Sequence, residues 1–243
     1  MRITLSLVVL CFVYGAQSVC LTDHWWNQYH WSFGSGGRDL TIANCHGPSS
    51  GRIKGKTVTS PLTTSDWSEI YQHVVGNWVM DDALGYRLQP VSCNQNADIV
   101  MLNDFYGNTG WLGIAEISVS DGMHIDASWS KFNDYYGYKY GDPKAVAKSV
   151  QCQEVGHTLG MDHQSETGEN CGSCMDYWSG GFNLNVDAED TALIRQVYNL
   201  SKPDGAAGHA TWGSGGGGGG GGRGPNIHGV PKPSQSSGAR AGG

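Results

Sequence analysis

The chain has 243 residues, with 15 lysines and arginines against 22 aspartates and glutamates, which gives a net charge of −7. An acidic chain without a run of basic residues lacks the electrostatic footprint of a nucleic-acid-binding protein. Its one long apolar stretch lies at the N-terminus and is shorter than the ~20 residues that a membrane span requires. The composition therefore excludes nucleic-acid binding and multiple membrane spans, and the length allows one domain with a tail.

Residues 1–18 have the pattern of a secretory signal peptide. Arg2 provides the positive start, residues 3–14 form the apolar core, and Ala16 and Ser18 are the small residues of a cleavage site. We therefore expect a secreted, extracellular protein with no membrane contact after signal removal.

Residues 19–200 carry the apolar patterning of a single folded domain. A helix is predicted to begin at Asp66, because apolar residues follow it at the spacing of one helical face. Two buried strands are predicted over 97–102 and 111–119, and a third strand begins at His124.

A second helix is predicted over residues 143–159. Asp142 is suited to cap its start, and Pro143 fits the first helical position, where no backbone donor is required. Gly160 can adopt the left-handed conformation that ends a helix. A last helix is expected to follow Asp187. Helices and strands in this order indicate an α+β fold.

Residues 201–243 lose the apolar periodicity of the domain. They include the uninterrupted glycine run 215–222, followed by a stretch rich in proline, serine and glycine. Glycine has no side chain to bury and loses the most backbone entropy when it becomes ordered. We expect these residues to form a disordered, glycine-rich tail.

Cysteine usage agrees with secretion. Of the seven cysteines, Cys11 leaves with the signal peptide. Six cysteines then remain, and an even number of cysteines in a secreted chain predicts up to three disulfides, with 15 possible connectivities. Cys171 and Cys174 form a CxxC pair, but the second pair of a zinc site is missing, so a structural role is favoured. The six remaining cysteines are Cys20, Cys45, Cys93, Cys152, Cys171 and Cys174.

An eleven-residue segment that begins at Gln153 carries the strongest chemical signal. Gln153 and His157 are four residues apart and project from one helical face, with Glu154 beside them. Gly160 allows a sharp turn, after which His163 can return to the same point. Three donor side chains next to a carboxylate are what zinc catalysis requires.

This segment resembles the motif of the metzincin metalloproteases, H-E-x-x-H-x-x-G-x-x-H followed by a methionine turn. The agreement is with the secreted, microbial, matrixin-like branch. The matching residues are Glu154, His157, Gly160 and His163. Gln153 stands where the family has its first zinc-binding histidine.

Two further stretches extend the resemblance. Met175 lies where the family has its methionine turn, and residues 110–115 resemble the strand that flanks the substrate. The resemblance implies a five-stranded mixed sheet with three helices, and a cleft between helix 143–159 and the segment around Met175. It also leads us to expect a disulfide from Cys152 to the loop before Met175.

The resemblance implies a zinc-dependent endopeptidase that acts as a monomer on protein or peptide substrates. Gln153, His157 and His163 are then the ligands of one catalytic Zn²⁺. Glu154 is the general base that takes a proton from metal-activated water, and Tyr177 is a second catalytic group that stabilises the transition state.

Gln153 leaves three alternatives open. Its amide oxygen is a weaker zinc donor than imidazole but can still ligate. Tyr177 can fill the place instead. The site can also be inactive, in which case the chain is a secreted binding protein with a metzincin-like cleft.

A second, structural ion and a latency switch are two minor possibilities. His124 with Asp121 and Asp126 leaves room for a structural Ca²⁺ or Zn²⁺. Cys45 is expected to be disulfide-bonded rather than to act as a latency switch.

Overall fold

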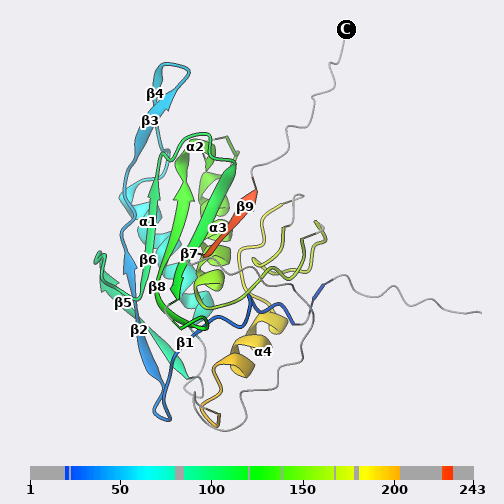
Figure 1. Cartoon of the computed structure of the whole chain (residues 1–243). Coiled ribbons are helices and arrows are strands. Elements are labelled where there is room, and N and C mark those ends of the chain that lie inside the picture. Colours follow the sequence, from blue (N-terminus) through cyan, green and yellow to red (C-terminus); the bar gives the residue numbers. More distant parts are fainter. Residues whose placement is uncertain are drawn as a thin grey trace, which may run out of the picture.

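The computed structural model describes most of the predicted domain. The predicted signal peptide lies outside the described residues, as does most of the predicted tail. The described residues are 20–21, 23–79, 85–119, 121–137, 139–166, 168–177 and 181–202, and the backbone of 226–231. Within them the fold is mixed α/β, in agreement with the α+β expectation, and one large sheet is covered by helices (Figure 1).

The main sheet has the strand order β5-β2-β6-β8-β7-β9, and the short β1 also pairs with β8. All of these strands run parallel except at one edge, where β7 is antiparallel to β8 and β9 is antiparallel to β7. Their bounds are β1 His30–Trp31, β2 Arg38–Asn44, β5 Tyr86–Ser92, β6 Ile99–Asp104, β7 Trp111–Val119, β8 His124–Asn133 and β9 Asn226–Pro231.

The three predicted strands are confirmed as β6, β7 and β8, while β2 and β5 were not predicted. With seven described strands, the sheet is larger than the five strands that the resemblance implied. β9 belongs to the segment for which the sequence predicted disordered coil. A separate hairpin is formed by β3, Ser50–Ile53, and β4, Lys56–Thr59.

Four helices occur among the described residues: α1 Thr64–Trp78, α2 Asp134–Gly137, α3 Pro143–Thr158 and α4 Ala188–Val197. The predicted caps of α3 and α4 are confirmed, because Asp142 and Asp187 accept hydrogen bonds from the first turn of each helix. The start of α1 was misplaced. Asp66 is the third residue of α1, and its side chain completes a capping box with the N-cap residue Thr63. None of these helices has the length and apolar character needed to cross a membrane.

α1 and α3 pack against each other, and α3 also lies across β6, β7 and β8. Gly156 allows the closest part of this packing. A Cβ atom on Gly156 would lie 2.5 Å from the sulfur of Met175 and 2.6 Å from the indole of Trp78. Glycine inside a helix costs about 0.5–1 kcal/mol relative to alanine. Because Gly156 has no side chain, α3 can contact both Met175 and Trp78, which offsets this cost.

Two glycine-to-alanine substitutions test this packing. Gly156→Ala should lower the free energy of unfolding by about 1–3 kcal/mol, because the added methyl overpacks the contact. Gly76 in α1 has open space around it, so Gly76→Ala should raise stability by about 0.5–1 kcal/mol. Urea unfolding with the disulfides intact measures both. Stabilisation by both substitutions would contradict the packing argument.

Candidate metal centre and active site

The C-terminal half of α3 buries polar side chains instead of an apolar stripe. Gln153 is 2% exposed, and Glu154 and His157 are fully buried. Burying such groups costs free energy unless they find partners. This half of the helix is therefore a candidate site and not ordinary core.

A tight turn follows α3 and returns the chain to it. Gly160 has a φ of +92°, and a Cβ atom there would collide with the carbonyl oxygen of Tyr29. Only glycine suits both conditions. The turn brings His163, 1% exposed, back against the helix. The Nε2 atoms of His157 and His163 lie 3.1 Å apart, so the predicted convergence of the two histidines is observed.

The hydrogen bonds at Nδ1 determine what these two Nε2 atoms can do. His157 Nδ1 lies 2.8 Å from the carbonyl oxygen of Met161, and His163 Nδ1 lies 3.3 Å from the carboxylate of Glu166. Both partners only accept hydrogen bonds, so each Nδ1 carries a proton, and in the neutral form of each imidazole Nε2 presents a lone pair. Two lone pairs facing each other repel unless a cation lies between them.

The 3.1 Å spacing suits a shared metal ion. Two nitrogens at ~2.0–2.1 Å from a tetrahedral zinc ion lie about 3.3–3.4 Å apart. Metal-binding histidines typically donate their other ring N–H to a carbonyl or carboxylate, as His157 and His163 do here. The donor pair therefore fits zinc.

Gln153 adds a third donor from the same helical face. Its Nε2 donates to the carbonyl oxygen of Asp176 at 3.2 Å, which fixes the amide orientation. Its Oε1 is buried and has no hydrogen-bond partner among the described residues. A fixed, buried carbonyl oxygen without a hydrogen bond is a suitable neutral ligand for a cation.

The side chain of Glu154 extends from α3 toward β7. A Cβ atom on Gly113 of β7 would lie 2.7 Å from Glu154 Oε1 and would overlap Val150. The absence of a side chain at Gly113 thus gives the Glu154 carboxylate its place beside the strand. This role of Gly113 was not predicted from the sequence.

Tyr177 lies next to His163, with ring centroids 3.8 Å apart. Burial raises the pKa of Tyr177 well above its usual value, and the negative charges of Glu154 and Glu166 add to the shift. The structure therefore brings Tyr177 into contact with His163 of the candidate site.

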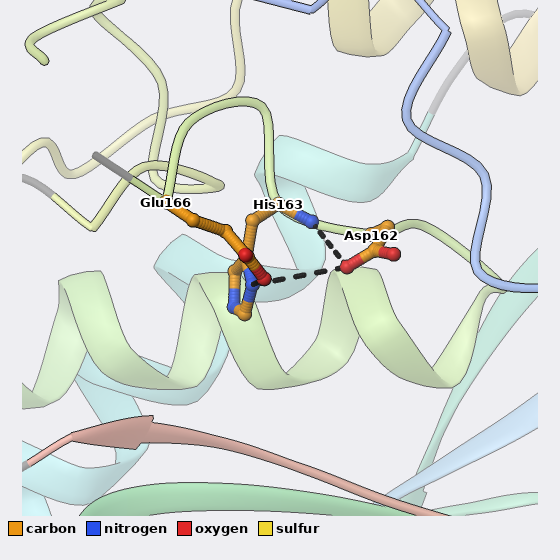
Figure 2. A group of neighbouring side chains, drawn as sticks. All are labelled: Asp162, His163 and Glu166. Carbon is orange, nitrogen blue, oxygen red and sulfur yellow. Dashed lines mark hydrogen bonds and ion pairs between the residues drawn. The ribbon is translucent and has the colours of Figure 1, made fainter. Parts of the chain in front are cut away.

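Asp162, His163 and Glu166 form a group whose ligand atoms all lie within 4.8 Å of one another, so it could hold a metal ion (Figure 2). Both carboxylates approach the Nδ1 side of His163, at 3.7 Å and 3.3 Å, and the Glu166 side chain is 66% exposed. These positions orient the imidazole and direct its Nε2 toward His157.

The possible structural ion at His124 finds no support in the described residues. Asp121 instead accepts hydrogen bonds from the backbone N–H groups of Met123 and His124 and pairs with the His124 ring. These contacts engage both carboxylate oxygens in a local turn. No metal-binding group that includes Asp126 occurs in the described part of the chain.

Three disulfides join the six cysteines of the described domain, and the expected link from Cys152 to the loop before Met175 is confirmed. It runs from α3 to Cys174, across a sequence separation of 22 residues. A loop of that length gives a stabilisation of about 3 kcal/mol in the chain-entropy model. Cys45 is disulfide-bonded, as expected. The pairs are Cys20–Cys171, Cys45–Cys93 and Cys152–Cys174.

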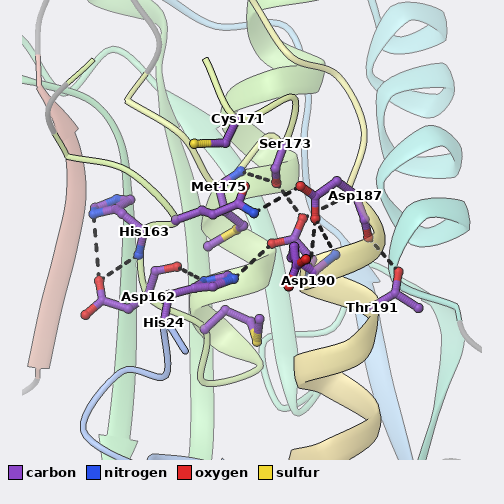
Figure 3. Close-up of polar contacts among 12 residues, drawn as sticks. His24, Asp162, His163, Cys171, Ser173, Met175, Asp187, Asp190 and Thr191 are labelled. Carbon is purple, nitrogen blue, oxygen red and sulfur yellow. Dashed lines mark hydrogen bonds and ion pairs between the residues drawn. The ribbon is translucent and has the colours of Figure 1, made fainter. Parts of the chain in front are cut away.

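A buried polar network that was not predicted from the sequence supports the loop that leads to Met175 (Figure 3). Asp190 of α4 accepts a hydrogen bond from Ser173 Oγ, which in turn accepts from the Met175 N–H at 2.9 Å. His24 Nε2 lies 3.4 Å from Asp190, and His24 Nδ1 lies 2.7 Å from the carbonyl oxygen of Asp162. The network thus joins the N-terminal segment, the methionine turn and α4.

Burial sets the protonation of this network. It raises the pKa of Asp190 to about 7 and lowers the pKa of His24. Both shifts favour the neutral forms. A protonated Asp190 can then donate to His24 Nε2, because His24 Nδ1 carries the ring proton toward Asp162.

Comparisons with known proteins do not show which family the chain belongs to. No protein-family model matches the chain, and no curated protein matches it. Among solved structures, the fold of this chain is similar to the structure of myroilysin. The TM-score is 0.39 and the sequence identity is 15%, and the match covers 70% of this chain and 82% of the myroilysin chain.

Two substitutions at Asp190 test the network. Asp190→Ala leaves Ser173 and the Asp187 N–H without an acceptor, so it should cost about 2–4 kcal/mol of stability. Asp190→Asn keeps an acceptor for both and offers a donor to His24, so its cost should stay below about 1 kcal/mol. Thermal and urea unfolding provide the comparison. Equal losses in the two variants would show that the hydrogen bonds are not what stabilises this region.

Proposed function

We propose that this chain is a secreted, zinc-dependent endopeptidase. The observation that carries the proposal is the approach of His157 Nε2 and His163 Nε2 to 3.1 Å, with a hydrogen-bond acceptor at each Nδ1. We infer that the buried Oε1 of Gln153, four residues before His157 on α3, is the third neutral donor. Three protein ligands with a position left for substrate or water are typical of catalytic zinc.

These three side chains would hold a zinc ion, which would supply Lewis-acid activation of a peptide carbonyl and of water. Glu154 provides the acid–base chemistry. Its carboxylate accepts a proton from the attacking water and later donates it to the leaving amine. Tyr177, which packs against His163, provides a phenol that can donate a hydrogen bond to the developing oxyanion.

β7 is suited to position the substrate. Gly113 brings this strand into contact with the Glu154 carboxylate. A peptide that pairs with the β7 backbone would therefore pass next to the general base, and main-chain hydrogen bonds would hold it extended.

A second candidate is a catalytically inactive secreted binding protein with a metzincin-like fold. Gln153 favours it, because an amide oxygen binds zinc more weakly than imidazole does. The zinc content of the purified protein separates the two candidates. One zinc per chain by atomic absorption supports the enzyme, and a metal-free protein after zinc supplementation supports the binding protein.

Glu154→Gln tests the role of the general base. The amide keeps the size of the side chain but cannot accept the proton, so hydrolysis of denatured casein should fall at least about 10²-fold. Zinc content should stay at the wild-type level, because Glu154 is not a ligand. A chelator should abolish the wild-type activity. Hydrolysis that persists in the variant would refute this mechanism.

Gln153→His tests the ligand sphere. One nitrogen of the new imidazole can face the metal while the other donates to the carbonyl oxygen of Asp176, as in the two native ligands. Zinc release to a chelator should become slower by about tenfold or more, because imidazole is the better donor. His157→Ala is the control and should lose zinc. Equal release rates in wild type and Gln153→His would show that Gln153 is not a ligand.

A further inference from the structure

β7 carries a strand on each side. One side pairs with β8, and the other pairs with β9, which comes from the C-terminal tail. The pairing with β9 is antiparallel and extends from Ile117 opposite Asn226 to Trp111 opposite Pro231. The tail thus adds a strand to the edge that the proposed function assigns to a peptide substrate.

The register places this tail strand beside the candidate site. Gly113, which contacts the Glu154 carboxylate, is opposite Val230, and Ile114 is opposite Gly229. β9 also lies close to α3, the helix that carries the candidate ligands. Figure 1 shows β9 along the outer edge of β7, next to α3, and Figure 2 shows the same strand passing alongside that helix.

We propose that the outer edge of β7 is a strand-addition site for extended peptides and that residues 226–231 are its intramolecular occupant. The tail then competes with substrate for the same backbone hydrogen bonds. The competition with substrate rests on the proposed endopeptidase function, while occupation of the edge does not.

The tail has the chemistry of such an occupant. Strand addition relies on main-chain hydrogen bonds and places few demands on side chains. Pro231 ends the pairing because it has no N–H to donate. The 23 residues from 203 to 225, which are rich in glycine, connect the strand to the domain. A tether of this kind gives an effective concentration of about 1 mM.

This concentration sets the size of the effect. For a segment that binds the free edge with a Kd of about 0.1–1 mM, the apparent KM of a substrate rises by a factor of one plus the ratio of effective concentration to Kd. The factor is therefore about 2 to 11. Such a segment slows hydrolysis and is displaced by a peptide at high concentration.

Proline substitutions in the full-length chain test the proposal. His228→Pro combined with Gly229→Pro removes two successive N–H groups, one of which must face β7 in an antiparallel pair. Ser236→Pro combined with Ser237→Pro, in the tail beyond the strand, is the matched control. We would measure hydrogen exchange of the β7 amides, kcat and KM for a quenched-fluorescence peptide, and binding of a labelled synthetic peptide with the sequence of residues 226–231.

The expected result is faster exchange of the β7 amides in the strand variant alone. In that variant KM should fall about two- to elevenfold at constant kcat, and the labelled peptide should bind more tightly than to wild type. Equal exchange and equal peptide binding in all three proteins would overturn the proposal, as would an unchanged KM in an active enzyme. If no protein hydrolyses peptides but the strand variant alone binds the labelled peptide, the endopeptidase proposal fails and occupation of the edge stands.

Discussion

The turn at Gly160 is the constraint on which the candidate site depends. It ends α3 with a positive φ and leaves no space for a Cβ atom beside the carbonyl oxygen of Tyr29. Because the chain reverses there, His163 lies against the helix that carries His157. Any other residue at this position would strain the backbone and displace the N-terminal segment, and the two imidazoles would separate.

The elements around α3 compensate for the polar groups that the helix buries. Trp31 Nε1 donates to the carbonyl oxygen of Thr158 at 2.8 Å, and the Tyr198 hydroxyl donates to that of Leu159 at 2.9 Å. These bonds satisfy carbonyls that a helix C-terminus leaves without partners. The disulfide between Cys152 and Cys174 joins the helix covalently to the methionine turn. The half of α3 that carries the candidate site is therefore held by hydrogen bonds at its C-terminus and by the disulfide at Cys152.

Short-range features could be predicted from the sequence, and long-range ones could not. The caps at Asp142 and Asp187 and the turn at Gly160 follow from the chemistry of one or a few adjacent residues. The parallel pairing of β2 with β5 and β6 depends on contacts across the whole chain, and a short apolar strand gives little local signal. The pairing of His24 with Asp190 joins residues far apart in sequence, and each of them alone resembles an ordinary surface residue.

An edge strand that receives peptides poses a problem when no peptide is present. Its unpaired N–H and C=O groups can pair with other chains and cause aggregation. β7 contacts Glu154 through Gly113, so a permanent fixed strand at this edge would close the candidate site. A tethered strand satisfies both requirements, because it covers the backbone groups of β7 and yet competes only weakly with an incoming peptide. The glycine-rich connection to β9 is consistent with that compromise, since a stiff, short connection would raise the effective concentration and exclude substrate.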